Sequence, residues 1–210
     1  MTLDDLGLRL PAAAPAVPPG LRARLLAAAD EHGLLDVAYR TVDSPIGPLL
    51  VAATPDGLVR IAFDCEGHDA VLAALAERVS PRILRAPERL DAAARQLEEY
   101  FAGTRQAFDL PIDLRLASPF RRTVVSRLPS IAYGTTASYA AVAVAVGNPA
   151  AVRAVGTACA TNPVPVVLPC HRVVRSDGTI GRYLGGTVAK ETLLALERGL
   201  RGTHAVVGPT

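Results

Sequence analysis

The sequence predicts an α+β protein in two parts, an N-terminal antiparallel sheet domain followed by a C-terminal helical domain with a helix-turn-helix. Residues 37–63 consist of short apolar runs separated by the turn sequences SPIG and PDG, which is the pattern of turn-linked strands. After Ser118 the chain changes to consecutive stretches with helical character. The charge changes near the same place: residues 1–119 carry 12 Arg against 17 Asp and Glu, whereas residues 120–210 carry 10 basic against 3 acidic residues.

The first part begins with an arm of unknown role, residues 1–35. Residues 10–20 are rich in Pro and Ala, which is typical of an extended linker, and residues 21–33 have the pattern of a short amphipathic helix closed by Gly33. The sheet domain then covers residues 36–116. Beyond the three expected strands, it contains helical periodicity at 69–79 and 88–103 and an extended segment at 108–114.

The second part, residues 117–200, contains three successive predicted helices at 119–131, 136–147 and 149–160. Asn148 can cap the third helix and Pro149 suits its first position, so the Gly147-Asn148-Pro149 turn predicts a helix-turn-helix unit. A further helix is expected at 188–199, ending at Gly199, before a tail at 201–210.

Composition bounds the class of protein. The 210 residues contain no run of 18 apolar residues and no basic-then-apolar leader at the N-terminus, so we expect neither a membrane span nor a secretory signal. Three widely spaced Cys do not form a disulfide framework, which favours a reducing cytoplasm. Cys65 and His68 have no second ligand pair nearby in sequence, so no metal site is expected. The basic second half suggests a polyanionic partner such as nucleic acid, although compositional scatter would give the same pattern.

Five residues are candidates for chemistry, and each also has a plain structural interpretation. Cys170 stands directly before His171, which suits a nucleophile and its base but equally a buried Cys beside a half-buried His. His171 can act on the Cys170 thiol only if the chain turns there, because neighbouring side chains in a strand point to opposite faces. Arg153 lies among small residues, which suits a helix approaching DNA or a solvent-facing Arg. Tyr139 could donate a proton or pack in the core. Glu197, near a helix C-terminus, could orient His171 or be a surface charge.

The segment from 117 to 199 closely resembles the O6-alkylguanine-DNA alkyltransferases, also called methylated-DNA–protein-cysteine methyltransferases. The motifs that carry the resemblance are PCHRVV, AVGNPAAVRAVG, NPVP and the tail YLGG…K…LL…E, in the family's order. Residues 37–115, opening with SPIGPLLVAAT, are compatible with the family's N-terminal domain. The resemblance implies a ribonuclease H-like sheet domain and a winged-helix-like second domain.

The resemblance also implies a reaction: a suicide DNA repair protein that flips O6-alkylguanine, and less well O4-alkylthymine, out of the duplex. Cys170 would accept the alkyl group and His171 would act as its base through a bridging water, oriented by Glu197. Asn162 would be the hinge of the site, and Tyr139 would assist the departing guanine. No cofactor is implied.

Other residues would then contact DNA or line the base pocket. Arg153 would enter the stack from the minor-groove side, and the other expected DNA-binding residues are Ser138, Ala151, Ala154 and Gly156. The expected pocket residues are Val173, Tyr183, Leu184 and Cys159. We expect the partner to be double-stranded DNA carrying the lesion, and the protein to be a monomer, with cooperative assembly on DNA left open.

The chain departs from the family's usual residues at Val125, Ala132, Cys159 and Arg182, none of which is a reacting group. Three other functions remain as alternatives. A non-catalytic alkyltransferase-like protein would bind the lesion but lack the reactive Cys. A Cys-His hydrolase would turn over repeatedly and need an oxyanion hole. A damage-sensing regulator would carry an additional zinc-binding module.

Overall fold

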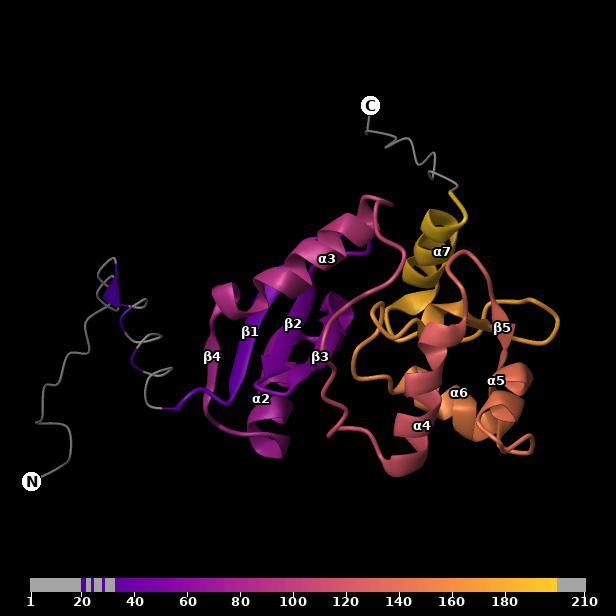
Figure 1. The fold of residues 1–210 in the computed structure, drawn as a ribbon, viewed down its shortest axis with the longest axis horizontal. Helices are drawn as coiled ribbons and strands as arrows, with labels where there is room; N and C mark the ends of the chain where they lie inside the picture. The colour runs from indigo at the N-terminus through magenta and orange to yellow at the C-terminus, as the bar shows by residue number, and fades with distance from the viewer. Residues whose placement is uncertain (1–19, 22–23, 25–27, 29–32, 200–210) are drawn as a thin grey trace, which may run out of the picture. The chain divides into compact units, whose positions relative to one another are not determined.

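The computed structural model describes residues 20, 21, 24, 28 and 33–199. Most of the predicted arm at 1–35, including most of its helix at 21–33, and the tail at 201–210 lie outside these described residues. From Leu35 onward the described chain forms one compact unit in which a sheet with its helices is followed by a group of helices (Figure 1). Within the described residues, no helix is both long enough and apolar enough to span a membrane.

The three strands expected between 37 and 63 are present as β1 (Val37–Val42), β2 (Leu49–Thr54) and β3 (Gly57–Phe63), paired antiparallel in sequence order. A fourth strand, β4 (Ile83–Arg85), pairs parallel with β1 and completes the sheet order β3-β2-β1-β4. The sequence did not predict β4, because three residues are too few to show an alternating pattern. The sheet is therefore antiparallel with one parallel edge strand.

The extended segment predicted at 108–114 runs beside the start of β3. Leu58 N–H donates to the Pro111 carbonyl at 2.8 Å, and Asp113 N–H donates to the Leu58 carbonyl at 2.8 Å. This close approach requires glycine at position 57, where φ is +137° and a Cβ would clash with the Pro111 backbone. The segment thereby carries the chain from the sheet domain to the helical domain.

Two helices accompany the sheet. In α2 (His68–Arg78), Leu75 packs against Val37, Ala52 and Val59 in one core cluster. The 3-10 helix η3 (Pro87–Leu90) leads into α3 (Asp91–Phe101), which lies along the strands in Figure 1. The buried face of α3 ends in Tyr100, whose side chain is fully buried.

The helical domain contains all of its predicted helices, three of them shorter than expected. They are α4 (Pro119–Arg127), α5 (Tyr139–Ala145), α6 (Val152–Ala160) and α7 (Gly186–Glu197), with the 3-10 helix η4 (Leu128–Ser130) after α4. The helix predicted from 149 begins only at Val152, so the expected capping by Asn148 and the placement of Pro149 in its first turn are wrong. The physical reason is a turn closed by the bond from Ala151 N–H to the Asn148 carbonyl at 3.0 Å.

A two-stranded parallel pair joins distant parts of the helical domain. β5 (Ala137–Ser138) pairs with β6 (Val173–Val174), so the start of α5 lies beside the residues that follow Cys170. Ser138 also caps α5, because its Oγ accepts the Ala141 N–H at 3.0 Å. This pairing brings Tyr139, the first residue of α5, to the region of the cysteine.

Candidate active site

Cys170 opens a short 3-10 helix, η5 (Cys170–Arg172), which supplies the turn that the sequence argument required. The turn is closed by the bond from Arg172 N–H to the Pro169 carbonyl at 3.0 Å. Consecutive side chains in such a turn do not point to opposite faces as they would in a strand. The Cys and His of the motif are therefore free to serve one site.

Asn162 holds the cysteine in place. Its Nδ2 donates to Cys170 Sγ at 3.2 Å and to the Leu168 carbonyl at 2.7 Å, while its Oδ1 accepts the Val164 N–H at 3.0 Å. The Asn162 side chain is fully buried, so these bonds form without competition from solvent. The predicted hinge residue thus makes direct contact with the predicted nucleophile.

The Cys170 thiol is neutral in this resting arrangement. Burial raises its pKa to about 11, although the hydrogen bond from Asn162 and the charge of Lys190 act in the opposite direction. A neutral thiol is a poor nucleophile, so the site needs a base close to the sulfur.

His171 and Glu197 form a buried pair that can supply this base. His171 Nε2 lies 2.7 Å from Glu197 Oε1, and both side chains are fully buried. Arg172 donates to both oxygens of Glu197 at 2.9 to 3.1 Å, and Gly134 N–H donates to Oε2 at 3.1 Å. The plain reading of Glu197 as a surface charge is therefore wrong.

Burial keeps His171 neutral, and the carboxylate of Glu197 selects its tautomer. Burial opposes ionisation of the carboxyl, but hydrogen bonds from His171 and Arg172 prevail and lower its pKa to about 2. Burial lowers the pKa of His171, which is therefore a neutral imidazole. Its Nε2 faces a carboxylate and so carries the proton, whereas Nδ1 is buried without a hydrogen-bond partner among the described residues. That nitrogen is free to accept a proton.

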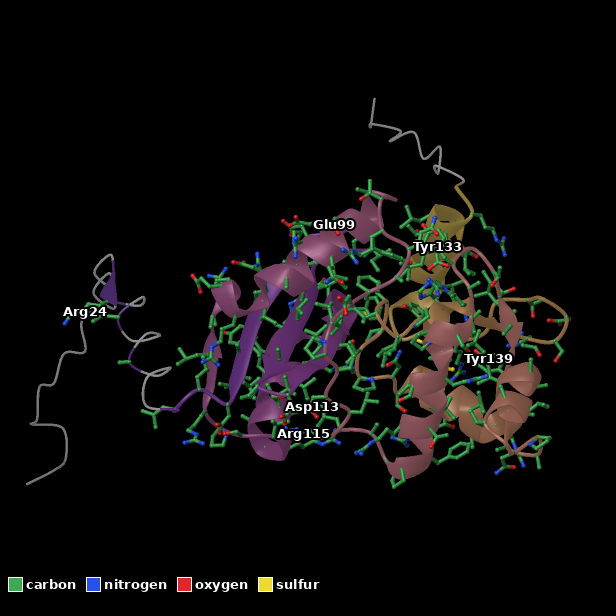
Figure 2. All side chains as sticks on the ribbon, viewed as in Figure 1. Arg24, Glu99, Asp113, Arg115, Tyr133 and Tyr139 are labelled. Carbon is green, nitrogen blue, oxygen red and sulfur yellow. The ribbon has the colours of Figure 1, made fainter. Side chains whose placement is uncertain are left out.

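Tyr139 lies at the start of α5, as labelled in Figure 2, and is partly buried. Its pKa is raised by burial and then by the thiols of Cys159 and Cys170, so the hydroxyl keeps its proton. Gly181 lies close to it, because a Cβ there would approach the Tyr139 hydroxyl oxygen to 2.5 Å. Tyr139 is therefore a neutral hydrogen-bond donor at the edge of the site.

The four predicted pocket residues lie in two groups. Val173 and Cys159 are buried, and burial raises the pKa of the Cys159 thiol, with the charge of Cys170 adding to the shift. Tyr183 and Leu184 lie in the loop before α7 and are partly buried. The Tyr183 ring lies 5.5 Å from that of Phe63 and 6.5 Å from that of His171, so this loop contacts both domains.

The predicted DNA-contacting residues lie mainly on one surface. Arg153 and Ala154 are exposed on α6, and Ala151 and Gly156 are partly exposed beside them. The opposite face of α6 buries Val155, Ala158 and Cys159, and the chain then continues directly to Asn162. One short helix therefore joins the proposed DNA surface to the hinge of the buried site. Ser138 lies outside α6, at the start of α5, where its Oγ caps that helix.

The structure adds four residues that the sequence argument did not assign. These are Tyr100, Gly134 and Arg172, which donate to Glu197, and Lys190, which donates to the Val173 carbonyl at 2.6 Å. One signal was available: Lys190, the single lysine of the chain, and Glu197 occupy the i and i+7 positions of the apolar stripe that Leu193 and Leu194 define on α7. Charged residues on a buried helical stripe indicate a polar site.

Comparison with known proteins agrees with this geometry. Residues 119–199 match the DNA-binding domain, and residues 37–114 the ribonuclease-like domain, of 6-O-methylguanine DNA methyltransferase. The methylated-DNA–protein-cysteine methyltransferase of Mycolicibacterium paratuberculosis is 41% identical over 162 residues, 77% of this chain and 93% of that protein. The constitutive enzyme of Bacillus subtilis is 38% identical over 161 residues, 76% of this chain and 94% of that protein.

Solved structures of the same kind of protein have a similar fold. The crystal structure of Mycobacterium tuberculosis OGT in complex with DNA superimposes with a TM-score of 0.67 at 37% identity, covering 78% of this chain and 94% of that chain. The predicted fold class, a sheet domain followed by a helical DNA-binding domain, is therefore confirmed. The chain belongs to the methylated-DNA–protein-cysteine methyltransferase family.

Proposed function

We propose that this protein repairs double-stranded DNA by moving the alkyl group of O6-alkylguanine, and less efficiently that of O4-alkylthymine, onto its own Cys170. The observation that carries the proposal is the buried turn at Cys170, which joins a thiol held by Asn162 to the His171–Glu197 pair. Such a pair is the arrangement needed to remove a proton from a thiol whose pKa is raised.

The reaction is a displacement at the alkyl carbon. The proton of the Cys170 thiol passes to His171 Nδ1, in the family through a bridging water, and Glu197 stabilises the imidazolium that forms. The sulfur forms a bond to the alkyl carbon as the bond from that carbon to guanine O6 breaks. The electron pair of the broken bond stays with the purine, which takes a hydrogen bond or proton from Tyr139. The product thioether is stable to water, so each molecule reacts once.

DNA recognition is proposed for the surface of α6. Its small side chains allow the helix to approach the duplex closely, and Arg153 is long enough to occupy the space left by a flipped base. The reacting guanine would then lie against Val173, between Cys159 and the loop with Tyr183 and Leu184. This route needs no metal and no cofactor, and it requires only one protein molecule per lesion.

The alternative of a non-catalytic lesion binder is disfavoured by the same site. A protein that only flags damage has no need of a reactive thiol, whereas this chain has Cys170 in the same short turn as His171, which contacts Glu197. A Cys-His hydrolase would form a thioester that water cleaves and would react repeatedly, so a reaction that stops at one equivalent distinguishes the two functions.

Intact-protein mass spectrometry tests the proposal. After mixing with duplex DNA containing O6-methylguanine, we expect a gain of one methyl group, located on Cys170 by peptide mapping and ending at one equivalent. Cys170→Ser should gain no methyl group yet still bind DNA, since the recognition surface is elsewhere. Methylation of Cys159 or Cys65, or turnover beyond one equivalent, would contradict the proposal.

A further inference from the structure

Tyr100 brings a hydroxyl from the sheet domain into the buried site of the helical domain. It lies in the last turn of α3, yet its hydroxyl donates to Glu197 Oε1 at 2.8 Å and lies 3.4 Å from His171 Nε2. The Tyr100 side chain has no solvent exposure. The sheet domain therefore touches the two residues that control the proton of the thiol.

We propose that Tyr100 is a positioning residue for alkyl transfer, which fixes the tautomer of His171 and tunes its basicity through Glu197. This inference rests on the proposed function, since it assumes that His171 is the base for Cys170. It means that the sheet domain is part of the reaction machinery and not only a neighbour of it.

The hydrogen bonds around His171 support the tautomer that has its proton on Nε2. A phenol has one hydrogen to donate, and Tyr100 gives it to Glu197. The lone pairs of the Tyr100 oxygen and the charge of Glu197 Oε1 then both face His171 Nε2. Two acceptors around one ring nitrogen require that nitrogen to carry the proton, which leaves Nδ1 bare for the proton of Cys170.

The hydrogen bond from Tyr100 to Glu197 also affects the basicity of His171. Burial, followed by the charge of Glu197, raises the pKa of Tyr100 far above its ordinary value, so the phenol is a neutral donor at any working pH. By donating to Glu197 it takes up part of the negative charge that would otherwise stabilise a protonated His171. Tyr100 thus keeps His171 less basic than the carboxylate alone would make it.

The groups facing His171 come from several elements. They are Glu197 and Lys190 on α7, Arg172 and Cys170 in η5, Tyr183 in the loop before α7, and Tyr100 on α3. Replacing Arg172, Lys190 or Glu197 would change the charge of the site. Tyr100→Phe removes one hydroxyl and keeps the charge, and it also keeps a ring that packs 5.3 Å from the rings of Phe101 and Phe108.

A neighbouring tyrosine offers a matched control. The ring of Tyr133 lies 6.2 Å from that of Tyr100 and 5.6 Å from the Arg172 guanidinium, contacts that Tyr133→Phe retains. Within the described part of the chain its hydroxyl makes no hydrogen bond to Glu197. The two variants therefore remove the same atom from adjacent rings, one bonded to the carboxylate and one not.

The test measures the rate of methyl transfer to Cys170 in the full chain as a function of pH. In the wild type the rate falls at low pH, where His171 becomes protonated. In Tyr100→Phe the less neutralised Glu197 raises the pKa of His171, so this fall should begin at a higher pH. The variant also loses the Tyr100 oxygen that helps hold the proton on Nε2, so fewer molecules present a bare Nδ1 to the thiol. The rate at the optimum should therefore drop by up to about tenfold, the size expected for one lost hydrogen bond to a charged group. Tyr133→Phe should keep both the wild-type rate and the wild-type pH profile.

Nitrogen-15 NMR of the wild-type imidazole provides a second readout that does not depend on the variant folding. It should show Nε2 protonated and Nδ1 bare, and a proton on Nδ1 would overturn the inference. An unshifted pH profile in a folded Tyr100→Phe protein would overturn it as well. If the wild type itself failed to methylate Cys170, the proposed function would fall, which is a distinct result.

Discussion

The network around Glu197 and the exposed face of α6 differ in how their residues depend on one another. Glu197 accepts hydrogen bonds from four residues in three separate parts of the chain, Tyr100, Gly134 and the neighbours His171 and Arg172, and it is almost inaccessible to solvent. The face of α6 is a run of neighbouring small residues with one long cation, Arg153, in contact with solvent. The first region is held together by long-range contacts and the second by a single helix.

This difference separates two kinds of effect. In the buried network a lost partner leaves other polar groups without compensation, so stability and chemistry change together. On the exposed face a lost side chain leaves nothing unsatisfied, so the folded protein is unaffected and only steps that involve DNA change. Mutations in each region should therefore give distinguishable patterns.

The largest effect is expected for Glu197→Gln. The substitution keeps the shape but removes the charge that compensates the buried Arg172, so the free energy of unfolding should fall by about 3–5 kcal/mol. It should also slow methyl transfer severely, because protonated His171 loses its counter-charge. Urea denaturation and single-turnover rates measure the two effects, and Glu191→Gln, an exposed position on the same helix, should change neither.

The acid stability of the same variant sharpens the comparison. Glu197 has a pKa of about 2 in the folded protein against 4.5 ordinarily, so its ionisation stabilises the fold above pH 4.5 and this contribution is lost as the pH falls toward 2. The wild type should lose stability across that window, whereas Glu197→Gln should lose less. Parallel unfolding curves for the two proteins between these pH values would contradict the network.

A smaller and more selective effect is expected for Arg153→Ala. Unstacking a base costs a few kcal/mol, and a side chain that fills the gap offsets part of this cost. The variant should therefore react at least about tenfold more slowly with O6-methylguanine in duplex DNA, while its rate with the free base O6-benzylguanine stays unchanged. Arg153→Lys should fall between, since it keeps the charge but loses the planar donor group.

The control for charge alone is Arg127→Ala, which removes an exposed cation from α4 in the same domain. It should change only the salt dependence of DNA binding. Equal losses with duplex and free base in Arg153→Ala would make Arg153 a structural residue of α6 and refute its assignment to the DNA stack.

The same division explains what the sequence could predict of the fold. The three long strands and every helix of the helical domain were predicted, because each has a local apolar period or turn sequence of its own. β4 was missed because a three-residue strand is defined by its pairing with β1, which lies far away in the sequence. α6 was predicted to start three residues early because the Gly147-Asn148-Pro149 sequence suits a helix start, whereas it forms a separate turn closed by the Asn148 carbonyl. Local signals indicate that an element exists, but they do not fix where it begins.

In the site, the sequence identified Cys170, His171, Asn162 and Glu197 through a motif, but it did not identify their environment. The sequence assigned no role to Tyr100, which lies on the buried face of α3. Nothing local indicates that its hydroxyl meets a carboxylate 97 residues away. The raised pKa of Cys170 and the depressed pKa of Glu197 arise from burial and from partners distant in the sequence, so they required the folded chain.

We expect the smallest effect for Ser138. Its substitution tests whether the DNA surface ends at α6. Sequence resemblance suggested a role in DNA binding, whereas the structure makes its Oγ the cap of α5. Loss of one capping bond in Ser138→Ala should lower the free energy of unfolding by about 1 kcal/mol. Ser138→Asn can cap equally well and should restore the lost stability.

If Ser138 acts only as a cap, both variants should bind duplex DNA like the wild type. The rate of methyl transfer should then be unchanged in Ser138→Asn, the more stable of the two. Loss of affinity in both variants, measured by fluorescence anisotropy at fixed salt, would show instead that Ser138 contacts DNA, and would extend the DNA surface from α6 to the start of α5.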